Sequence, residues 1–186
     1  MPDETTPGGV EPDDTVVGPF VVTVLHEFSH ALLDMFYTPM FGREEDAADQ
    51  LAAYLYLQLG EEESRRLIRG TLYNYLVVET HDEDSAQTVD EFIEDSAETH
   101  SLPAQRAYNL ICMAYGANPK SFGDLATKVK LPDHRKEFCV EEYEQVHQAY
   151  VDLIRPHVDR ELANKVFDKS LLREVDQSRW NEMRRQ

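Results

Sequence analysis

The chain has 186 residues, 41% of them hydrophobic, and its 36 acidic residues outnumber its 18 lysines and arginines to give a net charge of −18. This length and hydrophobic share suit a single domain with one core. Because so acidic a surface repels phosphate backbones and anionic lipids, we expect neither a nucleic-acid partner nor insertion into a membrane.

The N-terminal residues have the composition of a disordered segment. Residues 1–18 are rich in Pro, Gly, Asp, Glu and Thr, which predicts a disordered acidic lead-in before a single helical domain over residues 19–186. The segment lacks the basic and apolar regions of a signal peptide, and we count no apolar stretch of 18 residues anywhere in the chain. As written, the sequence therefore predicts a cytoplasmic location, or export if the N-terminus is truncated.

The first predicted helix, residues 20–36, contains the motif H-E-x-x-H from His26 to His30. Residues four apart lie on one face of a helix, so both imidazoles can bind the same zinc ion. Glu27 lies about 100° around the helix from His26, which suits a general base acting on a water at the metal. The alternatives are two ordinary core or surface histidines and a solvated glutamate.

A catalytic zinc site needs three protein ligands and an open position for water, so a third ligand must come from outside the motif. A metzincin would supply a histidine six residues after the motif and a glycine three residues after it. Here these positions hold Phe36 and Leu33, which excludes that class.

The second predicted helix, residues 44–59, supplies the missing carboxylates and ends at Gly60. Glu45 and Asp49 are four residues apart and share a helix face. We predict that Glu45 is the third zinc ligand and that Asp49 accepts a hydrogen bond from a ligand histidine, which orients the ring. Asp46 is the alternative ligand.

The remaining elements are also predicted to be helical, since no run alternates like a strand; residues 14–17 would form one strand at most. The expected fold is all-α, with little or no sheet and with the H-E-x-x-H helix packed on the helix that carries E-x-x-x-D. Gly70 is expected to bend or split the third helix. The further helices are predicted at residues 61–78, 89–97, 102–115, from Asn118-Pro119 onward, 140–154 and 160–185, with loops at 79–90 and 131–133.

Two separate blocks of this sequence resemble one known family. The first is the motif helix from Leu25 to Met35 with the following GREEDAADQLAA, and the second runs from His100 to Gly116. They are similar to a bacterial family of metallopeptidases, otherwise a domain of unknown function in the zincin clan, over roughly residues 20–157. The H-E-x-x-H and E-x-x-x-D pair is gluzincin-like. The resemblance also implies a disulfide between Cys112 and Cys139, with two buried thiols as the alternative.

A polar cluster opens the second block: His100, Gln105, Arg106 and Asn109. Such residues commonly cap helices and form hydrogen bonds between helices. The gluzincin resemblance implies a functional alternative, in which His100 or Arg106 stabilises the oxyanion of a tetrahedral intermediate.

These observations predict a zinc-dependent metallohydrolase that acts as a peptidase on a peptide or protein substrate, with Zn²⁺ as its cofactor. One alternative is a non-catalytic zinc-binding or regulatory protein, because about twenty residues before His26 are too few for the substrate-binding sheet of gluzincins. The other is a di-iron carboxylate bundle that uses Glu27-x-x-His30, Glu144-x-x-His147 and Glu45.

Overall fold

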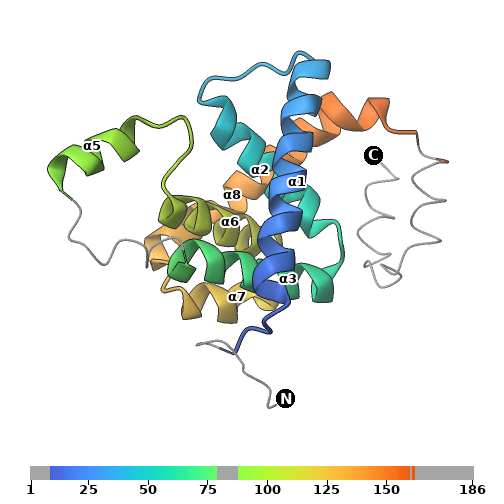
Figure 1. The fold of residues 1–186 in the computed structure, drawn as a ribbon. Coiled ribbons are helices and arrows are strands. Elements are labelled where there is room, and N and C mark those ends of the chain that lie inside the picture. The colour runs from blue at the N-terminus through green and yellow to red at the C-terminus, as the bar shows by residue number, and fades with distance from the viewer. Residues whose placement is uncertain (1–8, 79–87, 160, 162–186) are drawn as a thin grey trace.

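The computed structural model of the protein describes residues 9–78, 88–159 and 161 (Figure 1). Within these ranges every regular element is helical and none is a strand, which confirms the predicted all-α fold. The elements are α1 (Asp14–Met35), α2 (Glu44–Leu57), α3 (Glu61–Tyr73), the π-helical turn Asn74–Val78, α5 (Val89–Ala97), α6 (Pro103–Ala117), α7 (Pro119–Lys128), α8 (Asp133–Ala149), the π-helical turn Tyr150–Ile154 and the 3-10 turn Arg155–His157.

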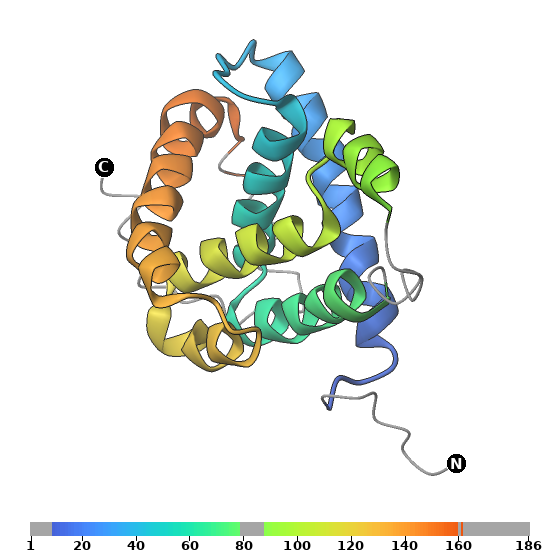
Figure 2. The same ribbon diagram turned by 90° about the vertical axis from the view of Figure 1, so that its left-hand side faces the viewer.

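Helix α6 lies at the centre of the core. It contacts α2, α3, α7 and α8, and Figure 2 shows it crossing the middle of the molecule with α8 along one side. Its sequence explains this position, because most of its residues are small or apolar. The most deeply buried residues of α6 are Ala107, Ile111, Cys112, Met113 and Ala114.

Helix α1 begins at Asp14, before the boundary at residue 19 that composition predicts. Residues 14–18 are therefore helical, whereas residues 1–8 of the expected lead-in lie outside the described residues. The Asp14 carboxylate is buried and forms an ion pair with Arg66 of α3. A pairing between residues so distant in the chain leaves no local signal, which is why composition misplaces the start of the domain.

The backbones of α1 and α3 touch where they cross. A Cβ atom added at Gly70 would collide with the Asp14 carbonyl, and one added at Gly18 would collide with the Leu67 carbonyl. Gly70 does not split the third helix as one alternative predicted, because α3 is continuous through it. Gly70 instead permits the close approach of α1, whose lower half lies beside α3 in Figure 1.

Strong local signals predict several helix ends correctly. Gly60 has a φ of 100° between α2 and α3, a conformation that favours glycine. Asn118 caps α7, and its side chain accepts hydrogen bonds from the amides of Lys120 and Ser121, each at 3.2 Å. Helix α5 has the predicted bounds of 89–97.

The last helices differ from the prediction. α8 begins at Asp133 instead of residue 140, so it includes the charged turn that we expected to precede it. That turn is held by an ion pair from Arg135 to Glu142, the next charged residue on the same side of the helix. The predicted helix at 160–185 lies outside the described residues except for residue 161.

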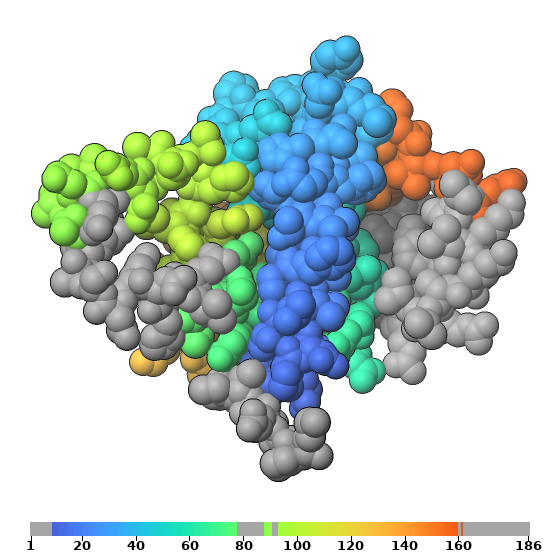
Figure 3. Space-filling view, viewed as in Figure 1, coloured from blue at the N-terminus to red at the C-terminus, as the bar shows by residue number. Residues whose placement is uncertain are grey.

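Helix α1 is longer than the helix predicted at residues 20–36, and it is largely apolar. By length and composition alone α1 is apolar enough over 18 residues to cross a membrane, contrary to the expectation for the chain, but a core helix or a signal sequence meets the same criterion. Figure 3 shows α1 as a continuous band across one face of the molecule. Its opposite side packs on α2 and α3 and carries His26 and Ser29, both buried.

Candidate metal centre

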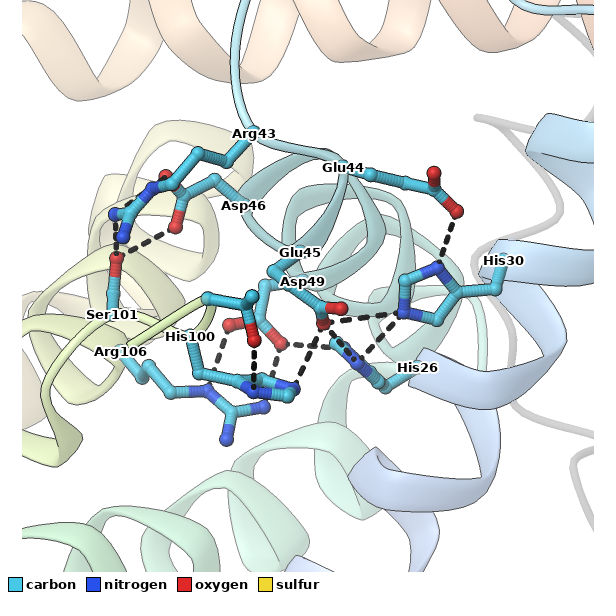
Figure 4. A network of polar contacts seen from close by, with 11 residues as sticks. His26, His30, Arg43, Glu44, Glu45, Asp46, Asp49, His100, Ser101 and Arg106 are labelled. Carbon is cyan, nitrogen blue, oxygen red and sulfur yellow. Dashed lines mark hydrogen bonds and ion pairs between the residues drawn. The ribbon is translucent and has the colours of Figure 1, made fainter. Parts of the chain in front are cut away.

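The C-terminal half of α1 and the first turn of α2 bring the three predicted ligands together (Figure 4). The Nε2 atoms of His26 and His30 are 3.1 Å apart. Glu45 Oε2 lies 3.1 Å from the first and 3.2 Å from the second. The His26 side chain is 4% exposed and the other two are each 23% exposed, so the three atoms lie at the edge of the core and face outward.

These distances fit three ligands of a single ion. Tetrahedral bonds of about 2.0–2.1 Å to zinc place neighbouring ligand atoms about 3.3–3.4 Å apart. The three separations in the structure, 3.1, 3.1 and 3.2 Å, are close to that value. The donor set of two imidazoles and one carboxylate is also one that zinc binds.

His26 and His30 each have a carboxylate within hydrogen-bond distance of Nδ1, the ring nitrogen that faces away from Glu45. Asp49 Oδ1 lies 2.8 Å from His26 Nδ1, and Glu44 Oε1 lies 2.8 Å from His30 Nδ1. Both Nδ1 atoms donate to these carboxylates, so in neutral rings the lone pairs of both Nε2 atoms point toward the Glu45 carboxylate. A cation among these electron-rich atoms removes the repulsion.

Glu44 is the site residue that sequence reasoning missed. Its place in the first turn of α2 suits an ordinary interaction with the helix dipole, and that is all its position predicts. In the structure, its hydrogen bond to His30, with the nearby Glu45 charge, raises the pKa of that imidazole. Glu45 faces the metal centre and its neighbour Glu44 faces the second histidine, a division of roles that the sequence alone does not show.

Arg106 acts on the centre through Asp49. Its Nε and Nη2 atoms donate to Asp49 Oδ2 and Oδ1, both at 2.8 Å, in a bidentate ion pair. This pair directs the guanidinium to Asp49, so in the structure Arg106 holds that carboxylate in place. The oxyanion role of Arg106 stays a prediction. With Glu44 and Glu45, the centre has three carboxylates and one guanidinium, a formal charge of −2 that a divalent cation balances.

The second sequence block also supplies His100 and Ser101. His100 Nε2 lies 2.8 Å from Glu45 Oε2, which brings a third histidine to the same carboxylate oxygen. Ser101 Oγ donates to Asp46 Oδ1 at 2.6 Å and accepts a hydrogen bond from Arg43 at 2.7 Å. In the structure the Asp46 carboxylate therefore binds Ser101 and Arg43, whereas Glu45 is the carboxylate beside the two histidines.

Glu27 is exposed on α1 beside His26. Among the described residues, no hydrogen bond or ion pair involves its carboxylate. A free carboxylate next to the ligand face is available to accept a proton, and the helical geometry of the motif remains the basis for assigning it that role.

The chain matches the model of a family described as "Putative metallopeptidase" over residues 3–154, a range that includes both sequence blocks. The chain belongs to this family. No curated protein and no solved structure matches it. Membership supports a metal-dependent peptidase in general terms, and the His26, Glu45 and His100 cluster is a site able to hold the metal.

The matched range of this family member also contains a disulfide between Cys112 of α6 and Cys139 of α8. Their Cα atoms are 5.0 Å apart and both side chains are buried. The bridge joins two helices, because α8 begins before residue 140, where a helix was predicted, and so includes Cys139.

The second E-x-x-H motif does not reach the metal centre of this metallopeptidase-family chain. His147 Nδ1 lies 2.9 Å from the hydroxyl of Tyr54 on α2. Tyr54 is nine residues after Glu45, about 13–14 Å further along the helix axis at 1.5 Å per residue. This separation along α2 does not favour the di-iron alternative, which needs both motifs at one pair of ions.

Proposed function

We propose that this protein is a zinc-dependent metallopeptidase in which His26, His30 and Glu45 hold the metal. The observation that carries the proposal is the approach of three ligand atoms to within 3.1–3.2 Å of one another. Carboxylates beside the Nδ1 atoms of both histidines support it, since such partners fix the ring orientation and raise ligand basicity.

Zinc, when bound, lowers the pKa of a coordinated water and polarises a peptide carbonyl. The chain's own contribution is proton transfer and orientation. Glu27 takes a proton from the attacking water onto its carboxylate and then delivers it to the nitrogen of the leaving amine. Asp49 and Glu44 hold the two rings in place, and Arg106 holds Asp49.

The proposed substrate is a peptide or protein. Gluzincins commonly hold a substrate along the edge of a sheet, but the described part of this chain contains no strand. We propose that side chains at the ends of α1 and α2 and around His100 provide the contacts that position the scissile bond. This absence also favours the second candidate function, a zinc-binding protein without catalytic activity.

A digest of a diverse peptide library by zinc-loaded protein tests the proposal. We expect cleavage by the wild type and a kcat/KM about 10²–10⁴-fold lower for Glu27→Gln, which removes the general base but keeps the ligands. Glu62→Gln, an exposed glutamate of α3, is the matched control and should leave turnover unchanged.

Zinc content decides how a negative result is interpreted. If the fully loaded wild type cleaves no peptide, the non-catalytic function is correct. If Glu27→Gln retains both zinc and full activity, another residue is the base.

A further inference from the structure

Three histidines, and not two, approach the oxygen of Glu45 that faces the metal centre. His100 Nε2 is 2.8 Å from Glu45 Oε2, closer than the Nε2 atom of either helix histidine. One ligand atom each from His26, Glu45 and His100 lies within 4.8 Å of the other two. Figure 4 shows the His100 ring beside Glu45 and Asp49, on the side of the site where α6 begins.

We propose that His100 is a fourth protein ligand of the metal in the substrate-free protein, and that it is a displaceable one. The inference rests on the proposed metal site. Four protein ligands close a zinc site, whereas catalysis needs one position open. Departure of the His100 side chain opens that position, so this residue controls whether water or substrate reaches the metal.

The support around the three rings differs, which explains why His100 is the ligand that leaves. The Nδ1 atoms of His26 and His30 each meet a carboxylate at 2.8 Å. His100 Nδ1 meets the Thr99 hydroxyl at 3.5 Å, the limit of a hydrogen bond. A ring without a strong outer partner is a weaker and less oriented ligand.

His100 is also less buried than His26, which again makes it the ligand that leaves more easily. The side chain of His100 is 47% exposed, against 4% for His26. His26 lies on a packed helix, whereas His100 lies in the connection before α6. Rotation of the His100 side chain therefore displaces no core residue, and rotation of His26 would disrupt the contact between α1 and α2.

The neighbouring residue keeps His100 close when its ring moves. Ser101 is bound by Asp46 and Arg43, which lie on either side of Glu45 in the sequence. The backbone at His100 is thus held to the same helix turn that carries the third ligand. The ring can leave and return without a movement of α6.

Cobalt(II) replacement with azide as a probe tests this inference without an activity assay. The visible absorption spectrum of cobalt(II) depends on the number and geometry of its ligands. We expect azide to change the spectrum of the His100→Ala and His100→Gln proteins at a concentration at least about tenfold lower than in the wild type. We also expect both variants to bind zinc at least about tenfold more weakly. Loss of a residue that only hydrogen-bonds a ligand already costs about 10–100-fold in metal affinity. His134→Ala, an exposed histidine at the start of α8, is the control and should behave as the wild type.

Identical spectra and azide titrations for wild type and both His100 variants, with one cobalt bound per chain, would overturn the assignment of His100 and leave the three-ligand site intact. If the wild type binds no cobalt, the proposed metal site itself is wrong. The two failures are therefore distinguishable.

Discussion

The carboxylates of Glu44 and Asp49 have matching positions behind the two helix histidines. Each lies 2.8 Å from an Nδ1 atom. Asp49 is also held by Arg106, whereas the Glu44 side chain is half exposed. The buried histidine therefore has the more rigid support, and Glu44 is the partner whose removal tests the outer carboxylates with the least damage to the fold.

We predict that Glu44→Gln weakens zinc binding about 10–100-fold at neutral pH, because His30 loses the partner that orients it. The same change alters the pH profile. Glu44 raises the pKa of His30, and a proton on the ring competes with the metal, so zinc affinity in the wild type falls as the pH drops through that raised pKa. In the variant, the fall should begin at a lower pH.

Zinc dissociation constants measured from about pH 5 to 8 check this prediction, since histidines titrate in that range. Glu61→Gln is the matched control, because Glu61 is the first residue of α3 as Glu44 is of α2, with no histidine beside it. An unchanged affinity and pH profile in Glu44→Gln would show that the carboxylate is only a helix-end charge.

At the scale of helices, the site depends on how closely α1 approaches its neighbours. Gly70 lets the α1 backbone touch α3 at Asp14, and Gly18 forms the reciprocal contact. The contact lies at the N-terminal end of α1, and the ligand histidines lie further along the same helix. The crossing of α1 and α3 therefore sets the direction of the α1 axis, and with it the positions of His26 and His30 relative to α2.

We predict that Gly70→Ala lowers the free energy of unfolding by about 1–3 kcal/mol, the cost of overpacking, despite the better helix propensity of alanine. Gly123→Ala in α7 is the control. A Cβ there meets nothing within 4 Å, so the change should stabilise the protein by about 0.5–1 kcal/mol. Urea unfolding of both variants measures the difference. Equal effects of the two substitutions would contradict the close contact.

Local patterns predicted the elements that carry their own signals. The spacing of H-E-x-x-H and the capping residue Asn118 both identify features that lie within one helix or at its end. The roles of Glu44 and Asp46 could not be predicted, because they depend on where α1 and residue 101 lie relative to α2. The start of α1 at Asp14 likewise depends on Arg66, 52 residues away.

At the scale of the whole molecule, the disulfide and the metal centre stabilise different parts of the fold. Cys112 and Cys139 join α6 to α8, and the ligands join α1 to α2. Arg106 connects the two regions, because α6 carries both this residue and Cys112. Helix α6 is thus attached to α8 through the disulfide and to the proposed metal site through Arg106.

We predict that reduction of the disulfide lowers the free energy of unfolding by about 3–4 kcal/mol, since the bridge closes a chain loop with a sequence separation of 27. Urea unfolding with and without a reductant measures this loss. Zinc stoichiometry should stay the same in the reduced protein. A reduced protein that unfolds at the same urea concentration would contradict the stabilising role of the bridge.

The measurement that tests the central claim most directly is the zinc content of the purified protein and its Glu45→Ala variant, after saturation and removal of free metal. We predict one zinc ion per chain in the wild type and almost none in the variant, whose fold should persist in circular dichroism. Equal zinc in the two proteins, or no zinc in the wild type, would contradict a centre built from His26, His30 and Glu45.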